Sequence, residues 1–260
     1  MIKPVHQFIV LYVFIMNKVV SRTPGSTPLI VGLNPALQRC ITFSSPLTLG
    51  SVNRGDNSKV GIGGKGQDVL IAASCMGVRE VRLAMFLGSG PAGDQLGQLI
   101  EDITGDVDTV HCLFNTYTVN MPNSSFMEGA AVLSSPLSVR TAAQCRTCIS
   151  LVDSSSAETT EIIEPSETVS PEEVAVLLKG LSAAYKDSKA GGMAIMGSMP
   201  PGCSAQLYAD IIRATSDAQS KVLFDTVAGL SEALSVCATM DCKAFVKVDG
   251  LRGLVDTMMS

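Results

Sequence analysis

Short apolar runs alternate with segments of helical periodicity along much of the chain. Residues 29–33 and 81–86 are apolar runs typical of buried strands, and a helical segment ending near Met76 separates them. This order predicts parallel strands joined by right-handed crossovers. The alternation returns in the C-terminal third, where Ser170 is a predicted helix cap because Pro and two Glu follow it. We expect helices at 170–185 and 205–214 and strands at 193–196, 221–224 and 244–248. The pattern predicts an α/β fold with a mostly parallel sheet.

A second, more strictly alternating pattern marks a separate small sheet. Residues 38–43 and 52–60 alternate polar and apolar positions, as half-buried strands do. Further strands of this kind are expected at 111–119, 146–152 and 159–163. We therefore predict a β-sheet lid drawn from residues of about 37–60 and 108–165. Residues 120–136, rich in Asn, Ser, Gly and Pro, are predicted to form a flexible insertion in it.

Composition narrows the range of partners. With 260 residues, 46% of them hydrophobic, the chain can form one main domain with a sizeable core. Its net charge of −5 argues against nucleic acid or an anionic membrane as a partner, because both are bound mainly by clustered Lys and Arg. Residues 1–28 are expected to be an N-terminal extension. Their apolar run, 8–16, is too short to span a bilayer, and we interpret it as an extra strand, a leader peptide or a mis-assigned start.

The cysteines do not suggest a metal site. The chain has eight cysteines and two histidines, and Cys145 and Cys148 form the one tight pair. Residues three apart on a strand point to opposite faces, so these two thiols are expected to diverge. Without a second such pair, we expect reduced, mostly buried thiols and no zinc site.

The segment from Gly63 to Asp68, Gly-Gly-Lys-Gly-Gln-Asp, is the strongest candidate for a binding site. It stands between an extended segment and a helical one, so it is predicted to be a strand-to-helix turn. Glycine lets backbone N–H groups approach an oxygen-rich ligand, and the start of a helix adds unpaired donors. Lys65 adds a full positive charge. An ordinary glycine-rich turn with a solvated lysine remains an alternative.

Two nucleotide-binding motifs have glycine patterns similar to that of this turn. A Walker A loop would need glycine at the position of Lys59 and Ser or Thr at that of Gly66, so this hypothesis fails. The spacing of Gly61, Gly63 and Gly66 does satisfy G-x-G-x-x-G, with Glu80 as a ribose-binding acid. The preceding segment is polar, however, whereas a dinucleotide fingerprint follows a buried strand. A dinucleotide-binding enzyme therefore remains a weak alternative.

Further motifs accompany the turn in a fixed order. They are Ile30–Leu37 (Ile-Val-Gly-Leu-Asn-Pro-Ala-Leu), Phe86–Gly88, Cys145–Ile149, Glu164–Ser166 and Gly197–Gly202 (Gly-Ser-Met-Pro-Pro-Gly). Over residues of about 29–254 the chain resembles the ribokinase-like (PfkB) carbohydrate kinases, closest to the branch of 1-phosphofructokinase and tagatose-6-phosphate kinase. The resemblance implies a three-layer αβα sandwich with a β-sheet lid. It also implies a cytoplasmic enzyme that uses ATP and magnesium to phosphorylate a sugar or a sugar phosphate such as fructose 1-phosphate.

The resemblance also assigns a substrate site between the sheet and the lid. Its residues are Asn34, Gln38, Gly63, Gly64, Lys65, Asp68 and Arg146. Arg146 takes the place of an arginine that contacts the substrate phosphate, a task suited to a guanidinium fork. Gln38 stands where relatives carry an aspartate that binds a sugar hydroxyl, and Asp68 stands where they carry asparagine. A neutral Gln38 amide cannot form the charge-assisted hydrogen bond that an aspartate would form with a sugar hydroxyl.

On the nucleotide side the match is poorer. The resemblance places Glu164, Lys247, Asp249 and Arg252 near nucleotide and metal. Asp249 and Arg252 replace the asparagine and glutamate of an Asn-x-x-Glu motif. Asp225 matches a family aspartate, with a cap on the next helix as the favoured alternative. The catalytic Gly-Ala-Gly-Asp loop is expected beyond Ser260, since the similar segment 90–94 follows the second strand and is interpreted as a structural turn before an ordinary connecting helix at 95–103.

These observations predict a partial carbohydrate kinase domain at residues 29–260, lacking its C-terminal nucleotide-binding part and inactive alone. Phosphoryl transfer depends on positioning and charge stabilisation, which the missing loop would supply. The alternative is a non-catalytic pseudokinase that binds a sugar phosphate. The expected partner is a small sugar or sugar phosphate, and a homodimer through the lid is a further expectation.

Overall fold

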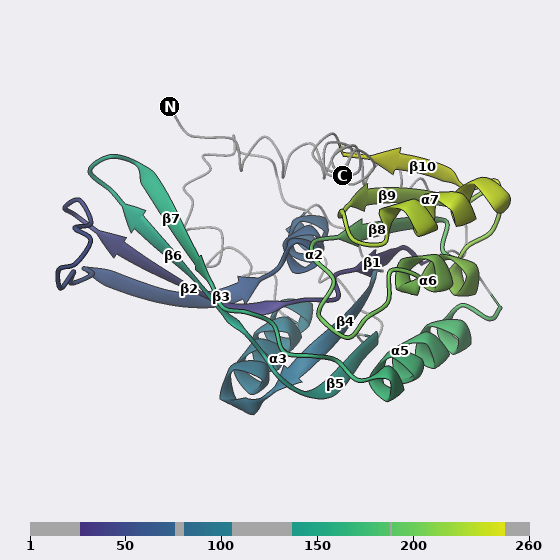
Figure 1. Ribbon diagram of the computed structural model, residues 1–260, viewed down its shortest axis with the longest axis horizontal. Coiled ribbons are helices and arrows are strands. Elements are labelled where there is room, and N and C mark those ends of the chain that lie inside the picture. Colours follow the sequence, from purple (N-terminus) through teal and green to yellow (C-terminus); the bar gives the residue numbers. More distant parts are fainter. Residues whose placement is uncertain (1–26, 76–80, 106–136, 188, 248–260) are drawn as a thin grey trace.

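The computed structural model of the chain describes residues 27–75, 81–105, 137–187 and 189–247. The expectations for residues 1–26, 111–136 and 248–260 lie outside these ranges. Within them, a six-stranded sheet is flanked by helices, and a separate four-stranded sheet projects from one end of it (Figure 1). The predicted α/β architecture with a small β-sheet lid is confirmed.

The strands of the main sheet all run parallel. Their order across the sheet is β10-β9-β8-β1-β4-β5. Their bounds are β1 (Leu29–Val31), β4 (Arg82–Ser89), β5 (Leu137–Gln144), β8 (Gly192–Met196), β9 (Lys221–Asp225) and β10 (Lys243–Val246). The central strands are continuously apolar because helices cover both of their faces. The parallel order brings the carboxyl ends of all six strands to one edge.

Helices form a layer on each face of this sheet. They are α2 (Lys65–Cys75), α3 (Gly90–Gly105), α5 (Pro171–Ala184), α6 (Leu207–Thr215) and α7 (Leu230–Thr239). Leu29 and Val31 pack in one hydrophobic cluster with α5, α6 and α7, whereas Ile30 packs in a second cluster with α2 and α3. The result is the expected three-layer αβα sandwich. None of the helices described is both long and apolar enough to cross a membrane.

The start of α5 agrees with the sequence prediction. The Ser170 side chain accepts a hydrogen bond from the Glu173 backbone N–H, and the Glu173 carboxylate accepts one from the Ser170 backbone N–H. This reciprocal pairing is a capping box. Glu173 also accepts from the Ala142 backbone N–H at 2.7 Å, which ties α5 to β5.

The lid is a sheet of order β3-β2-β6-β7. Its strands are β3 (Asn57–Gly63), β2 (Ala36–Phe43), β6 (Thr147–Asp153) and β7 (Glu158–Ile163). β2 pairs parallel with β6, and the two outer pairs are antiparallel. β2 follows β1 after four residues, and β6 follows β5 after two. The lid is therefore attached at the carboxyl edge of the main sheet (Figure 1).

The structure corrects two boundaries of the predicted lid. Residues 137–144 were included in the lid range, but they form β5, which pairs parallel with β4 at the edge of the main sheet. An edge strand is only half-buried, so its pattern resembles that of a lid strand. The strand expected at 52–60 instead runs from Asn57 to Gly63, because the side chain of Asn53 bonds its own loop and Val52 is exposed.

The segment from Gly90 to Asp94 is structural, as expected. It forms the first turn of α3, which begins earlier than the predicted helix. Asp94 forms a salt bridge with Arg140 of β5, and Arg140 also donates to the Gly88 carbonyl at 2.9 Å. These contacts hold α3 against the sheet and leave Asp94 in a structural role.

Two glycines let α2 cross the end of β1 closely. A Cβ atom added to Gly66 would lie 2.4 Å from the Gly32 Cα, a distance that real Cβ atoms do not show. Between them, the buried side chain of Gln67 donates to the Gly32 carbonyl at 2.9 Å. This approach fixes the first turn of α2 at the carboxyl edge of the sheet.

We therefore expect Gly66→Ala to lower the free energy of unfolding by about 1–3 kcal/mol, the usual cost of overpacking a well-packed contact. Gly180→Ala is the matched control, because a Cβ there meets nothing within 4 Å and lies inside α5. The control should raise stability by about 0.5–1 kcal/mol, since Ala favours helix over Gly. Urea denaturation would measure both, and equal effects of the two variants would contradict the close crossing.

Candidate functional site

The glycine turn lies where the lid meets the main sheet. β3 ends at Gly63 and α2 begins at Lys65, so Gly64 alone makes the turn, with φ of +113°. This backbone conformation is readily adopted only by glycine. The turn is therefore a strand-to-helix connection, as the sequence predicts, and it starts a helix at the carboxyl edge of the sheet.

Lys65 reaches from this turn to a buried carboxylate. Its Nζ lies 3.2 Å from both oxygens of Asp225, at the end of β9. Lys247, which follows β10, places its Nζ 3.4 Å from the same Asp225. The Asp225 side chain is 5% exposed and that of Lys65 is 54% exposed. These three groups together carry one net positive charge, and the Lys65 ammonium keeps a solvent-facing side.

Asp225 was expected to cap the following helix, and that prediction is wrong. α7 begins after Gly229, which makes no side-chain cap. The Asp225 carboxylate, at the end of β9, instead binds Lys65 of the glycine turn. Its backbone carbonyl accepts from the N–H of Gly197, the residue after β8, at 2.9 Å. It therefore positions Lys65 at the edge of the sheet.

Strand register places two predicted substrate residues on one face of the lid. Gln38 of β2 lies beside Cys148 of β6, and Arg146 precedes Cys148 by two residues. Arg146 lies outside the strand, in the connection between β5 and β6. Gly63 pairs with Ala36, two residues before Gln38, and strand residues two apart share a face, so Gly63 and Gln38 lie on the same side of the lid. A Cβ at Gly63 would approach Gln38 Oε1 to 3.0 Å.

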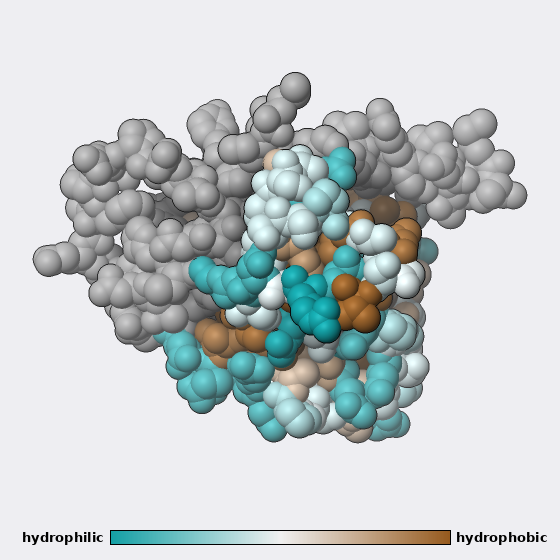
Figure 2. All heavy atoms as spheres, turned by 90° about the vertical axis from the view of Figure 1, so that its left-hand side faces the viewer, coloured by the Kyte–Doolittle hydropathy of each residue, from teal (hydrophilic) through white to brown (hydrophobic). Residues whose placement is uncertain are grey.

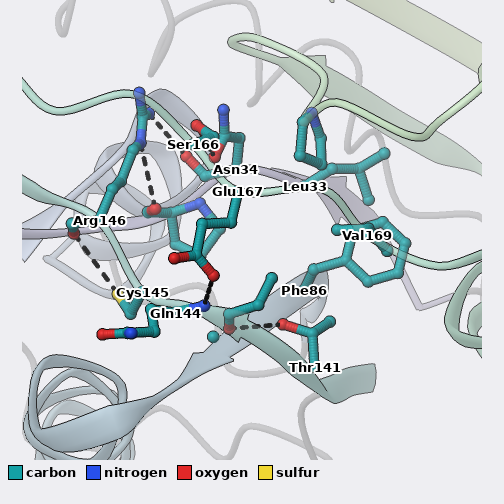
Figure 3. Close-up of a pocket in the computed structure, with 14 residues that line it drawn as sticks. Leu33, Asn34, Phe86, Thr141, Gln144, Cys145, Arg146, Ser166, Glu167 and Val169 are labelled. Atoms are coloured by element: carbon teal, nitrogen blue, oxygen red, sulfur yellow. Dashed lines mark hydrogen bonds between the residues drawn. The ribbon is translucent and has the colours of Figure 1, made fainter.

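Asn34 and Arg146 organise the connection between β1 and the lid. The Asn34 side chain donates to the Ser198 hydroxyl at 2.9 Å and accepts from the Ser166 hydroxyl at 3.0 Å. The Arg146 guanidinium donates to the Asn34 carbonyl at 2.9 Å and to the Pro35 carbonyl at 3.5 Å (Figure 3). Both residues thus hold the hinge of the lid, and part of the Arg146 fork is already engaged.

A small pocket opens beside these two residues. Figure 3 shows Arg146 and Asn34 on one side and Phe86 and Val169 on the other. Other lining residues come from β5 and from the segment before α5. The glycine turn does not line this pocket. The single substrate site expected from the sequence is therefore divided into two neighbouring regions, the pocket at Arg146 and the Lys65–Asp225 cluster. Asn34 lies beside the pocket and donates to Ser198, which follows β8.

Asp68 lies in the first turn of α2, three residues after Lys65. Its side chain reaches solvent, but the surrounding protein partly removes the carboxyl from water and raises its pKa to about 7. Near neutral pH the group is present in both forms. The protonated form can donate a hydrogen bond, as an asparagine side chain can.

The nucleotide-side expectations find little support. Glu164 is exposed, and its carboxylate accepts from the Thr147 backbone N–H at 2.7 Å. It therefore stabilises the end of the β6–β7 pair. Lys247 binds Asp225, while Asp249 and Arg252 lie outside the described residues. Among the residues that the structure describes, no three His, Cys, Asp or Glu side chains gather as metal ligands do.

Comparison with known proteins gives a clear architectural match. No family model matches the chain, and no curated protein sequence is significantly similar to it. Among solved structures, phosphofructokinase-2 from Escherichia coli in complex with fructose-6-phosphate matches with a TM-score of 0.59 at 16% identity, over 85% of this chain and 60% of that chain. A protein from Thermotoga maritima, described as a possible 1-phosphofructokinase, matches with a TM-score of 0.57 at 20% identity, over 80% of this chain and 57% of that chain. The chain has the ribokinase-like fold.

This chain spans less than two thirds of the length of both structures. In its ribokinase-like fold, the strand before the glycine turn is β3, an antiparallel edge strand of the lid. A dinucleotide fingerprint requires a buried parallel strand at that place. The match of Gly61, Gly63 and Gly66 to that fingerprint is therefore accidental, and the dinucleotide hypothesis is wrong.

The sequence did not reveal every polar residue near the candidate site. Ser150 of β6 and Glu161 of β7 lie on the same lid face as Gln38 and are joined to it by hydrogen bonds. Ser198 after β8 holds Asn34. Period-two alternation within each strand is the signal that could have suggested the first two, but only once the strand pairing is known.

The raised pKa of Asp68 predicts a pH-dependent stability difference. Its folded pKa, about 7, exceeds the ordinary value near 4, so deprotonation costs stability as pH rises from about 4 to 7 and adds no further cost above that. Asp68→Asn should therefore gain stability over the wild type across this range. We expect a gain of about 1 kcal/mol at pH 8 relative to pH 4, well below the full shift because solvent screens an exposed group. Chemical denaturation at several pH values would measure it, and a gain independent of pH would contradict it.

Proposed function

We propose that this chain is the acceptor-binding part of an ATP-dependent carbohydrate kinase that takes a sugar or a sugar phosphate, such as fructose 1-phosphate. The observation that carries the proposal is the exposed Lys65 ammonium, held by buried Asp225 beside the glycine turn. In parallel α/β sheets, ligands bind at the carboxyl edge of the strands. The ribokinase-like fold, shared with phosphofructokinases, supports the choice of ligand.

The chemistry of the site suits a phosphorylated polyol. Lys65 offers an ammonium group, and the first turn of α2 offers backbone N–H groups that have no partner within the helix. Arg146, in the connection between β5 and β6, has a guanidinium that can bind a phosphate. Gln38 and Asp68 provide uncharged or partly protonated groups for hydroxyls. Cations for the phosphate and polar groups for the sugar thus lie in two neighbouring regions, the Lys65–Asp225 cluster at the glycine turn and the pocket at Arg146.

We include ATP and magnesium in the proposal because the chain shares its fold with phosphofructokinases. The described residues do not fit a magnesium site, because the one deeply buried carboxylate at the edge, Asp225, is already bonded to two lysines. Asp94, in the segment most similar to the catalytic loop, pairs with Arg140 and lies inside α3, which begins at Gly90. We therefore assign no metal ligand and no proton acceptor among these residues.

Lys65→Ala should weaken binding of fructose 1-phosphate about 10- to 100-fold, since a charge-assisted hydrogen bond to phosphate is removed. Binding of unphosphorylated fructose should change little. Isothermal titration calorimetry would measure both ligands. Lys179→Ala is the control, because Lys179 is an exposed lysine of α5 on a helix that covers one face of the sheet. Equal losses for the two sugars, or none for the phosphosugar, would contradict the proposed phosphate contact.

Turnover distinguishes the kinase from the non-catalytic alternative. We expect this chain alone to form product from ATP and fructose 1-phosphate far more slowly than the about 1–100 per second typical of kinases. A coupled ADP assay would measure the rate. Tight binding of the phosphosugar with no turnover, even in a longer version of the chain that includes a Gly-Ala-Gly-Asp loop, would favour a sugar-phosphate-binding pseudokinase.

A homodimer through the lid is also proposed. The lid end of the molecule shows hydrophobic residues among hydrophilic ones (Figure 2). Four large apolar side chains of the lid are exposed, namely Leu49, Val52, Ile162 and Ile163. Sedimentation velocity should show a dimer in the wild type and a monomer in the double variant Ile162→Lys, Ile163→Lys. A monomeric wild type at micromolar concentration would rule out this assembly.

A further inference from the structure

Three polar side chains form a chain of hydrogen bonds across the lid, on the face that carries Gln38. Gln38 Nε2 donates to Ser150 Oγ at 2.7 Å, and Ser150 Oγ donates to Glu161 Oε1 at 2.7 Å. Ser150 is 2% exposed, and it lies directly opposite Glu161 in the pairing of β6 with β7. Water therefore has little access to the central hydroxyl.

The direction of these bonds is dictated by chemistry. A carboxylate such as Glu161 can only accept hydrogen bonds, so the single proton of the Ser150 hydroxyl must be donated to it. The Ser150 oxygen can then only accept from Gln38. The NH₂ group of Gln38 therefore faces Ser150, and its carbonyl oxygen faces the other way.

That carbonyl oxygen faces the glycine turn. Gln38 Oε1 would lie 3.0 Å from a Cβ built on Gly63, the last residue before the turn. Any side chain at Gly63 would crowd it, so the glycine leaves the oxygen accessible from the turn. A ligand held at Lys65, two residues along the chain, would lie near this oxygen.

We propose that Ser150 and Glu161 are positioning residues that orient Gln38 as a hydrogen-bond acceptor toward the ligand. The inference rests on the proposed function, because the ligand is taken to be a sugar phosphate. A free glutamine presents either its oxygen or its NH₂ group. The Ser150–Glu161 pair removes this choice, so the neutral amide selects a sugar hydroxyl that donates, as a carboxylate would.

Glu161→Gln tests the direction of the chain. The amide introduced at position 161 can donate to Ser150 as well as accept from it, so the Ser150 proton is no longer committed to position 161 and Gln38 can turn its NH₂ group toward the ligand. Affinity for fructose 1-phosphate should fall about 2- to 20-fold by calorimetry, as expected when part or all of the protein presents a mismatched donor. Binding of inorganic phosphate should stay unchanged. Glu158→Gln, an exposed position at the start of β7, is the matched control.

The double variant Gln38→Glu, Glu161→Gln is the rescue. The carboxylate introduced at position 38 carries oxygens on both sides and cannot be turned into a donor, so affinity should return to within about 3-fold of the wild type. An affinity of Glu161→Gln equal to that of the wild type, or a double variant no better than Glu161→Gln, would overturn the proposal.

Thermal unfolding without ligand separates this inference from the proposed function. Gln38→Glu alone sets two carboxylates against one hydroxyl proton, so its Tm should fall by about 3–6 °C, and adding Glu161→Gln should restore it. If this stability cycle holds but the wild type binds no sugar phosphate, the proposed function fails and the acceptor orientation of Gln38 stands. If the wild type binds the phosphosugar and Glu161→Gln changes neither affinity nor the Tm of Gln38→Glu, the orientation proposal fails alone.

Discussion

The close crossing of α2 over the end of β1 is the constraint on which the site depends. Gly32 and Gly66 have no side chains at the crossing, and Gln67 fills the remaining space with a bond to the Gly32 carbonyl. The first turn of α2 is thereby held against the carboxyl edge of the sheet. If the two backbones were separated by the width of a methyl group, Lys65 would move away from Asp225, and the turn would no longer join the lid to the sheet edge.

Charge at this edge is arranged around a single buried acid. A buried carboxylate is costly unless it is paired, and two lysines from distant parts of the sequence pair with Asp225. The more exposed of them, Lys65, is thereby held in place instead of moving freely in solvent. A fixed ammonium loses less conformational freedom when it meets an anion, which favours the binding proposed for Lys65.

Much of the fold could be predicted from the sequence, because the central strands and the cap of α5 are encoded locally. Continuous apolar runs predicted the strands that became β1 and β8, and Ser170 with Glu173 predicted the start of α5. β5 was not predicted as a strand, and its residues fell inside the lid range because a half-buried edge strand lacks the continuous apolar run of a central strand. The helix start at Gly90 was placed too late because Gly and Pro in a helical first turn look like a loop.

The site was harder to predict because its contacts join residues that are far apart in the chain. Lys65 and Asp225 are 160 residues apart, and only the order of the strands brings them together. The roles of Ser150 and Glu161 depend on strand register, which a single sequence does not give. Arg146 was predicted to face a phosphate, but its bonds to the Asn34 and Pro35 carbonyls depend on how the lid joins the sheet.

The joints of the lid have a mechanical consequence. Between β1 and β2 the chain crosses in four residues, between β3 and α2 it crosses at Gly64 alone, and between β5 and β6 it crosses in two. Any swing of the four-stranded sheet must be absorbed by the few backbone torsions in these crossings. The same torsions place Asn34, the glycine turn and Arg146. The shape of the proposed binding site and the angle of the lid are therefore coupled, because both depend on the same few backbone torsions.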